Sequence, residues 1–390
     1  MLPKERVIAA LEFHNPDRIP TGEIGIDFAL AEQSLGHPTL YRAKWREYAA
    51  IWQGRRDEYV ESCKRDIVAL ARKFDHDIVP AFLVPSRYRM PAQPQFISPF
   101  KWRMPDGRVY VYSPETQGNA FIVDGPRPES VEEVPDRAVD VDESQFELIQ
   151  YLVAELGDTH FIVARPPDDG IFPHDAYEMQ WLLSSMAERP EVVERVIAVE
   201  SSHYIEIGKR MLDAGCDAVI THNDVAGRNG LFMSPVMFER FCWPWLKAWA
   251  DMAHARGKYF FKHTDGNTWK ILDLMIAAGV DAWHGIQPSI GMALPELQAQ
   301  YGGRLCFWGG VDLDTLIAGT EDQVENEVRL AIESSPTEGG LILGAGNAVM
   351  VGVGLTNYLE MMRAVRVYQT GRSHAARHAA EASVVRDSAA

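Results

Sequence analysis

Residues 259–285 read YFFKHTDGNTWKILDLMIAAGVDAWHG, and this stretch contains a complete strand–helix–strand unit. An aromatic run at Tyr259–His263 predicts a buried strand, and apolar residues at helical spacing predict a helix over Thr268–Ala278. Gly279 stands before the next predicted strand, Ala282–Gly285, where a helix end favours a left-handed residue. A strand, a helix and a second strand in this order indicate two parallel strands joined by a crossover.

The same alternation continues on both sides of this unit. Further strands are predicted at His160–Ala164, Ala218–Thr221, Leu305–Gly309 and Leu341–Gly344, and helices at Pro235–Arg256, Leu294–Tyr301 and Glu321–Ser334. Two earlier runs, Arg18–Gly25 and Asp77–Phe82, complete a set of eight strands, the number in a (β/α)₈ barrel. The sequence therefore predicts an α/β fold, a single (β/α)₈ TIM barrel. A doubly wound open sheet is the alternative, but no G-x-G-x-x-G follows an early strand as its nucleotide-binding version requires.

The N-terminal part is less regular and is predicted to elaborate the barrel with helices and a hairpin. Residues 101–112, KWRMPDGRVYVY, predict the hairpin because Asp106-Gly107 stands between β-prone flanks. The predicted helices are Pro3–Leu11 and Leu40–Phe74. The expected limits are 1–372 for one barrel domain, 27–150 for its insertions and the hairpin, and 373–390 for a flexible tail.

The composition restricts the classes of partner. A net charge of -17 argues against nucleic acid, because few cations would replace the counterions of a phosphate backbone. The four cysteines include no C-x-x-C pair, which suits a reducing compartment better than a disulfide framework. No window approaches the run of about 18 apolar residues that a membrane span requires. We expect a cytoplasmic protein that acts on a small molecule, without nucleic-acid or membrane partners; a homodimer stays open.

Polar side chains gather where the predicted strands end. They are Glu23 near the end of the first strand, Arg165 after the third, His222 and Asp224 after the fourth, His263 at the end of the fifth and Asp265 after it, His284 near the end of the sixth and Gln287 after it, Trp308 in the seventh and Asn347 after the eighth. In (β/α)₈ barrels the carboxyl ends of the strands meet at one face, where active sites lie. We therefore expect these side chains to surround one mouth.

Imidazole and carboxylate groups bind borderline metals such as zinc, and three protein ligands with one open position are the usual catalytic arrangement. The candidate metal ligands are Glu23, His222, His263 and His284. The candidate catalytic residues are His263, Asp224, His222 and Asp265. The candidate substrate contacts are Arg165 and Arg228 for a carboxylate, Trp283 and Trp308 as pocket walls, and Gln287 and Asn347.

Each of these residues also has a structural interpretation. A histidine at a strand end is more often a hydrogen-bonding group than a ligand, and Glu23 could pair with Arg18 or Arg165. Asp224 and Asp265 could cap the helices that follow, because Asp is favoured at helix N-caps. The two tryptophans could be part of the core. The functional interpretation depends on the clustering of the set and on no single residue.

Residues from about Asp217 to Tyr368 resemble the uroporphyrinogen decarboxylase superfamily. The similar motifs are DAVITHNDVAGRNGLFMSPVMFERFCWPWLKAWADMAHARGK at 217–258, YFFKHTDGN at 259–267, LMIAAGVDAWHGIQP at 274–288 and LCFWGGVD at 305–312. The opening RVIAALEFHNPDRIP at 6–20 is also similar to the family's start. The resemblance implies a (β/α)₈ barrel, in agreement with the strand count.

The family has two well-known branches. Cofactor-free uroporphyrinogen decarboxylases hold an acidic tetrapyrrole with arginines of an Arg-Gln-Ala-Gly-Arg-Tyr loop, whereas residues 20–27 here read PTGEIGID. Glu23 and Asp27 would repel a substrate with many carboxylates. Zinc-dependent methyltransferases use His-x-Cys on the fifth strand and a Cys near the eighth. This chain keeps His263 but carries Asp265, and residues 344–347 read GAGN, so the resemblance implies a site of harder nitrogen and oxygen ligands.

The resemblance therefore implies an enzyme nearer to the methyltransferase branch. The expected reaction is metal-dependent transfer of a methyl group, with zinc as the expected metal. The methyl group would pass from a small methylated organic compound to a corrinoid on a separate protein, or to another acceptor. A metal-free decarboxylase or lyase of a small carboxylic acid, needing no cofactor, is the first alternative. A non-catalytic binding barrel is the second.

Overall fold

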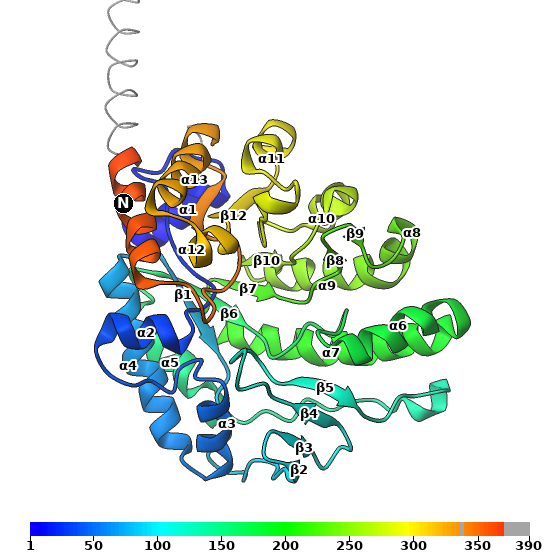
Figure 1. Cartoon of the computed structure of the whole chain (residues 1–390). Helices are drawn as coiled ribbons and strands as arrows, with labels where there is room; N and C mark the ends of the chain where they lie inside the picture. Colours follow the sequence, from blue (N-terminus) through cyan, green and yellow to red (C-terminus); the bar gives the residue numbers. More distant parts are fainter. Residues whose placement is uncertain (336–338, 370–390) are drawn as a thin grey trace, which may run out of the picture.

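The computed structural model describes residues 1–335 and 339–369. Within these residues, seven parallel strands form one curled sheet in sequential order, with helices around its outside (Figure 1). The strands are β1 (Ile78–Phe82), β6 (Phe161–Arg165), β7 (Ala218–Thr221), β10 (Tyr259–His263), β11 (Ala282–His284), β12 (Cys306–Val311) and β13 (Leu341–Ala345). The parallel order confirms the predicted α/β fold, since each crossover between parallel strands needs a long connection outside the sheet.

Side chains of the strands alternate between the two faces of the sheet, as the pleat requires. The inner face carries one apolar cluster, which includes Phe161, Phe261 and Trp308 and which helix α1 (Pro3–Leu11) covers with Val7 and Leu11. The outer face belongs to a larger cluster shared with the surrounding helices. A residue at a strand end therefore faces either the barrel interior or the helix layer.

The predicted first strand, Arg18–Gly25, is wrong as a strand. Thr21 and Gly22 instead make single parallel bridges to Leu343 and Ile78, which lie on the two edge strands β13 and β1. Pro20 has no N–H, and the N–H of Thr21 donates to the side chain of Asp77 at 2.8 Å. Neither Pro20 nor Thr21 therefore has a backbone N–H available for the inter-strand hydrogen bonds of a longer strand.

Asp77 ties this bridging segment to α1 and β1. Its buried carboxylate receives hydrogen bonds from the guanidinium of Arg6 and from that of Arg18, whose Nη1 lies 2.9 Å from Oδ2. Charge-assisted hydrogen bonds of this kind are stronger than neutral ones. The amino-terminal residues are thus held at the junction between the first and last strands.

Glu23 follows the bridging segment and faces the outer side of the sheet, against helix α4 (Arg56–Phe74). Its carboxylate accepts hydrogen bonds from the N–H of Ala345 and the hydroxyl of Tyr358, both at 3.2 Å. The Tyr358 hydroxyl also lies 2.9 Å from Nε2 of His76. Burial raises the pKa of Glu23 to about 8 and lowers that of His76 to about 3. At neutral pH both groups are therefore mainly uncharged.

The region between the first two barrel strands contains a small antiparallel sheet. Its strands are β2 (Gln95–Ser98), β3 (Lys101–Arg103), β4 (Val109–Val111) and β5 (Phe121–Asp124). The predicted hairpin is confirmed as β3 and β4, with Gly107 at φ 90° in its turn. Sequence reasoning missed β2 and β5, which are short and carry no turn signal as strong as Asp-Gly.

Two long predicted helices are interrupted. The helix expected over Leu40–Phe74 is divided into α3 (Trp45–Trp52) and α4, because Gly54 between them adopts φ 74°. The helix expected over Pro235–Arg256 consists of α8 (Pro235–Met237), a π-turn at Phe238–Cys242 and α9 (Trp243–His254). Pro244 has no N–H to donate to the carbonyl of Arg240, which favours the wider turn there.

The other helices follow the predicted alternation with strands. They are α2 (Phe28–Leu35), α5 (Glu147–Leu156), α6 (Ala176–Glu188), α7 (Pro190–Asp213), α10 (Leu272–Ala278), α11 (Leu294–Tyr301), α12 (Leu313–Ala318), α13 (Glu321–Ser334) and a helix over 355–369. In the part of the chain that the structure describes, none of these helices is long and apolar enough to cross a membrane. The tail expected at 373–390 lies outside the described residues.

Gly22→Ala should weaken the junction between β13 and β1. A Cβ on Gly22 would lie 2.6 Å from the Cβ of Ile78, so the bridge would have to open. Overpacking of this kind costs about 1–3 kcal/mol. The urea midpoint of Gly22→Ala should therefore fall below that of the natural protein. In the control Gly118→Ala the nearest atom is 3.7 Å away, and its midpoint should not fall. Equal midpoints for the two variants would contradict this expectation.

Glu23→Gln should remove a pH dependence of stability. Because the folded pKa of about 8 exceeds the ordinary value of 4.5, the folded protein keeps a proton that the unfolded chain releases between these values. The stability due to this proton is complete below pH 4.5 and is lost as the pH rises through about 8. Gln has no such proton to lose. The free energy of unfolding of the variant should therefore exceed that of the natural protein by a few kcal/mol at about pH 9.

The measurement is the urea midpoint of both proteins from about pH 4 to about pH 9, the range over which this linkage acts. The control is Glu333→Gln on the exposed side of α13, which should follow the natural protein at every pH. A Glu23→Gln profile parallel to that of the natural protein would show that Glu23 keeps an ordinary pKa.

Candidate functional site

Four inward-facing side chains lie at the carboxyl ends of neighbouring strands. Arg165 ends β6, His222 follows β7, His263 ends β10 and His284 ends β11. Each is two residues beyond a side chain of the inner apolar cluster, and a strand returns to the same face every second residue. The mouth expected from the sequence is therefore built by β6, β7, β10 and β11.

Asp224, His263 and Asp265 form a compact group at this mouth. One ligand atom from each of them lies within 4.8 Å of the others. Nε2 of His263 is 3.8 Å from Oδ1 of Asp224 and 3.8 Å from Oδ1 of Asp265. The N–H of Asp265 donates to Oδ1 of Asp224 at 2.7 Å, which holds the two loops together. Asp224 has 40% of its side chain exposed, so the group can be reached from solvent.

This group fits a divalent cation. An imidazole and two carboxylates are ligands that zinc accepts, and they leave further coordination positions open. Oδ1 of Asp265 is buried and accepts no hydrogen bond from any residue in the described ranges. Burial and the neighbouring Asp224 raise the pKa of Asp265 to about 8. A cation between the two carboxylates would remove that repulsion.

His284 supports His263 from behind. Their Nδ1 atoms lie 2.7 Å apart, and His284 packs edge-on against Trp308 with ring centroids 4.8 Å apart. If Nδ1 of His263 donates the hydrogen, its Nε2 presents a lone pair to the two carboxylates, the usual arrangement behind a metal-binding histidine. Burial, then the charges of Lys262 and Arg165, lower the pKa of His263 to about 3, so the ring is neutral.

A buried polar network holds the loops that carry these groups. The Asn223 amide donates to Oδ1 of Asp168 at 2.7 Å and to Oδ1 of Asp169 at 2.9 Å. Nζ of Lys262 lies 3.1 Å from Oδ2 of Asp169 and 2.8 Å from the carbonyl oxygen of Asn223. Asp224 is thereby positioned by its neighbour Asn223, which sequence reasoning did not single out.

The residues predicted as metal ligands occupy different places. Of Glu23, His222, His263 and His284, only His263 belongs to the compact group found among the described residues. Glu23 faces α4 on the outer side of the sheet, because its neighbour Ile24 takes the inner face. His284 contacts His263, and His222 lines an adjacent cavity. Asp224 and Asp265, predicted as catalytic, supply the remaining ligand atoms.

The two predicted pocket walls are buried in the core. Trp283 faces the helix layer, packs against Phe307 and donates its indole N–H to the carbonyl of Thr264 at 3.1 Å. Trp308 faces the barrel interior beneath His284 and donates to the carbonyl of Gly22 at 2.9 Å. Both side chains are fully buried, so the alternative of core packing describes them.

The other predicted substrate contacts are divided between loops. Gln287 accepts a hydrogen bond from the N–H of Gly266 at 2.8 Å, and the amide of Asn347 donates to Asp265. Both hold the loop after β10. Arg228 is exposed in the turn between β8 (Ala226–Gly227) and β9 (Gly230–Leu231). Arg165 lines the cavity beside His222.

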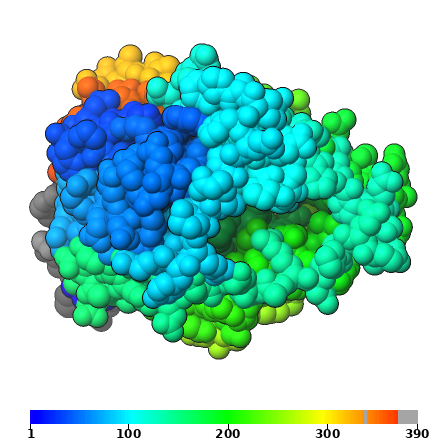
Figure 2. Space-filling view, turned by 90° about the horizontal axis from the view of Figure 1, so that it is seen from below, coloured from blue at the N-terminus to red at the C-terminus, as the bar shows by residue number. Residues whose placement is uncertain are grey.

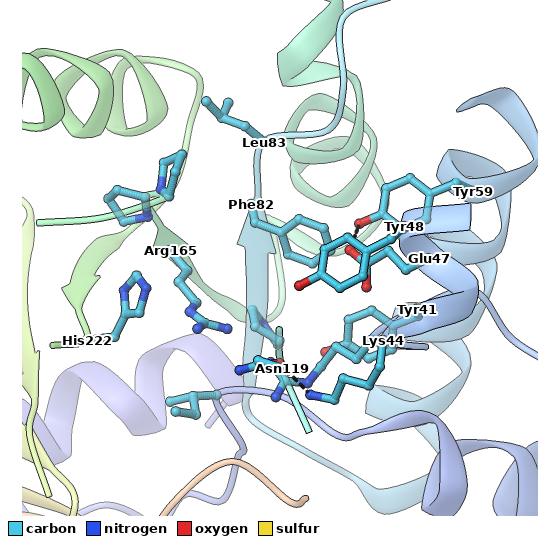
Figure 3. A pocket seen from close by; sticks show the side chains of 15 residues that line it. Tyr41, Lys44, Glu47, Tyr48, Tyr59, Phe82, Leu83, Asn119, Arg165 and His222 are labelled. Atoms are coloured by element: carbon cyan, nitrogen blue, oxygen red, sulfur yellow. Dashed lines mark hydrogen bonds between the residues drawn. The ribbon is translucent and has the colours of Figure 1, made fainter. Parts of the chain in front are cut away.

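This cavity has a volume of 270 Å³ and opens between the N-terminal elaboration and the barrel mouth. Figure 2 shows a hollow bordered by cyan and green segments, and Figure 3 shows the side chains within the cavity. Its lining includes Tyr41, Arg42, Lys44, Glu47, Tyr48, Tyr59, Phe82, Asn119, Arg165 and His222. Sequence reasoning missed the members between 41 and 59. Their one signal is the clustering of cations and aromatic rings in an acidic chain.

Comparisons with known proteins agree with the fold. A family model described as "Uroporphyrinogen decarboxylase (URO-D)" matches residues 175–368. A search of curated proteins finds no match. A methyltransferase from Methanosarcina mazei is similar with a TM-score of 0.68 and 18% sequence identity, over 94% of this chain and 99% of that one. At this identity the likeness shows a shared fold.

More distant solved structures are also similar. A sugar phosphate isomerase/epimerase from Parabacteroides distasonis has a TM-score of 0.38 and 9% identity, over 90% of this chain and 96% of that one. Likeness this remote adds nothing about chemistry. The matched family model and the full-length likeness in fold agree with the motifs at 259–267, 274–288 and 305–312. Residues 175–368 of the chain carry the uroporphyrinogen decarboxylase (URO-D) domain.

Proposed function

We propose that this chain is a metal-dependent enzyme that removes a methyl group from a small methylated organic compound. The methyl group passes to a corrinoid carried by a separate protein or to another acceptor. In this proposal the bridging segment at Thr21 and Gly22 takes the place of the eighth barrel strand. The reaction takes place at the mouth, where Asp224, His263 and Asp265 meet.

The compact group of Asp224, His263 and Asp265 is the observation that carries this proposal. An acidic pair around a neutral imidazole, with one carboxylate oxygen unpartnered, is costly to bury without a task. The resemblance of 259–267 to the methyltransferase branch supports His263 as the metal-binding histidine of this proposal. The two aspartates then stand in for its thiolates, which favours substrates activated through oxygen or nitrogen.

The chain's own residues orient this chemistry. A bound zinc ion would act as a Lewis acid on the atom that loses the methyl group. His284 fixes the ring of His263, and Asn347 holds one oxygen of Asp265. The cavity beside His222 holds the substrate next to the metal-binding group. Close positioning of this kind supplies much of the rate enhancement in group transfer.

The size of the cavity supports a small substrate. A volume of 270 Å³ lies at the lower end of small-molecule pockets, which measure about 300–1,000 Å³. A tetrapyrrole, with four rings and their acidic side chains, is much larger than this. The cavity therefore favours a small compound over the substrate of the decarboxylase branch.

Zinc content tests the metal site directly. After incubation with zinc and removal of loosely bound metal, elemental analysis should find about one zinc per chain, the stoichiometry of a three-ligand site. His263→Ala and Asp265→Asn should each lose it, because two remaining ligands bind weakly. The control is His14→Ala, whose ring is 72% exposed and distant in the fold; it should keep its zinc.

Zinc-loaded protein should then transfer methyl groups from methylated oxygen or nitrogen compounds to a reduced cobalt(I) corrinoid, with a proton replacing the methyl group on the demethylated product. The visible spectrum of the corrinoid follows the reaction. His263→Ala should lose this activity together with the metal. Absence of metal from the natural protein would contradict the proposal and favour a metal-free decarboxylase of a small acid, in which His263 and Asp265 move protons. Bound zinc without any activity would favour a binding barrel.

A further inference from the structure

The cavity beside His222 carries an excess of positive charge. Three cations line it, namely Arg42, Lys44 and Arg165. Nε of Arg42 and Nζ of Lys44 lie 2.6 and 2.9 Å from the two oxygens of Asp27, so one carboxylate serves both cations. The guanidinium of Arg165 makes no hydrogen bond or ion pair with any residue in the ranges that the structure describes.

The remaining carboxylate in the cavity, that of Glu47, makes no ion pair with Arg165. Glu47 accepts a hydrogen bond from the hydroxyl of Tyr59 at 3.0 Å, on the side of the cavity away from Arg165 (Figure 3). Burial raises the pKa of Glu47, which favours its neutral form. Burial and Arg42 lower the pKa of Arg165 to about 10, so Arg165 stays charged at neutral pH. The cavity is therefore cationic within a chain of net charge -17.

Flat aromatic rings make the opposite part of the cavity. Tyr41 and Phe82 stack with centroids 6.2 Å apart and planes 10° apart, and Tyr48 lies beside them. Figure 3 shows Arg165 and His222 on one side and these rings on the other. Aromatic faces favour a flat, unsaturated ligand, since rings gain from offset or edge-on packing.

We propose that this cavity binds a small aromatic carboxylate, with Arg165 as the counter-ion of the carboxylate and the rings of Tyr41, Tyr48 and Phe82 against its flat body. The planar fork of an arginine fits a carboxylate with two parallel hydrogen bonds. Among the described cations that line the cavity, Arg165 is the one without an ion-pair partner, so its guanidinium is free to take the carboxylate. This inference names the substrate class of the proposed function and rests on it.

The position of His222 connects this subsite to the metal-binding group. His222 lines the cavity with Arg165, and Asp224 stands two residues further along the same strand exit. A compound held by Arg165 therefore lies next to the residues that would act on its methylated group.

The test compares two probes, benzoate and its neutral analogue benzamide, by calorimetric titration. Natural protein should bind benzoate at least tenfold more tightly than benzamide. Arg165→Met should weaken benzoate binding about tenfold to a hundredfold and leave benzamide unchanged, as loss of a charged hydrogen bond predicts. Arg165→Lys keeps the positive charge but lacks the planar guanidinium. Its affinity for benzoate should therefore lie between those of the natural protein and of Arg165→Met. The control Arg304→Met, whose side chain is 53% exposed and is not part of the cavity lining, should bind benzoate as the natural protein does.

Folding of Arg165→Met is checked by its urea midpoint, which should not fall, because the variant removes an unpaired buried cation.

The inference is overturned if the natural protein binds no benzoate up to millimolar concentration, or if Arg165→Met binds it equally well. Tighter binding of phenyl phosphate would assign the cavity to phosphates, and equal binding of cyclohexanecarboxylate would remove the aromatic requirement. Zinc is measured on the same samples: benzoate binding without zinc refutes the proposed reaction alone, and zinc without benzoate binding refutes this inference alone.

Discussion

The buried carboxylate of Asp77 is the constraint on which the barrel mouth depends. It pairs with Arg6 and Arg18 and accepts the N–H of Thr21, so it places the segment that bridges β13 and β1. Removing one partner from such a buried pair is strongly destabilising, because it leaves a charge without compensation. The carbonyl of Gly22 in this segment then holds Trp308, which packs under His284. The orientation of His284, which contacts His263, is thus coupled to an ion pair at the opposite end of the sheet.

Local patterns predicted most of the barrel but not its junction. The unit at 259–285 could be read correctly because its strands, helix and Gly279 all favour the same local structure. Arg18–Gly25 failed because the N–H of Thr21 is taken by Asp77, far away in the chain. Glu23 was assigned to the mouth because the same segment was predicted as a strand. Within a segment of isolated bridges, the sequence alone does not show which side chains face inward.

The site could be predicted only in part for a different reason. Strand ends converge in any barrel, so the histidines and aspartates after β7 and β10 could be expected together. The geometry of the loops, set by Asn223 and Lys262, decides which of these side chains lie close enough together to bind one metal ion. No local sequence pattern shows this geometry. The cavity walls between Tyr41 and Tyr59 belong to an insertion. An insertion has no fixed relation to the strand ends, so only its folded position brings it to them.

In the proposed function, chemistry and recognition are carried by separate parts of the chain. The candidate metal-binding group is on β10 and the loops after β7 and β10. All three tyrosines and two of the three cations that line the cavity in the described residues come from one stretch of fewer than twenty residues, 41–59. A lineage that acquired a different stretch at this place would inherit an intact reaction centre facing a new set of walls. Natural variation among relatives should then concentrate in this insertion, and a laboratory search for new substrates could be confined to it.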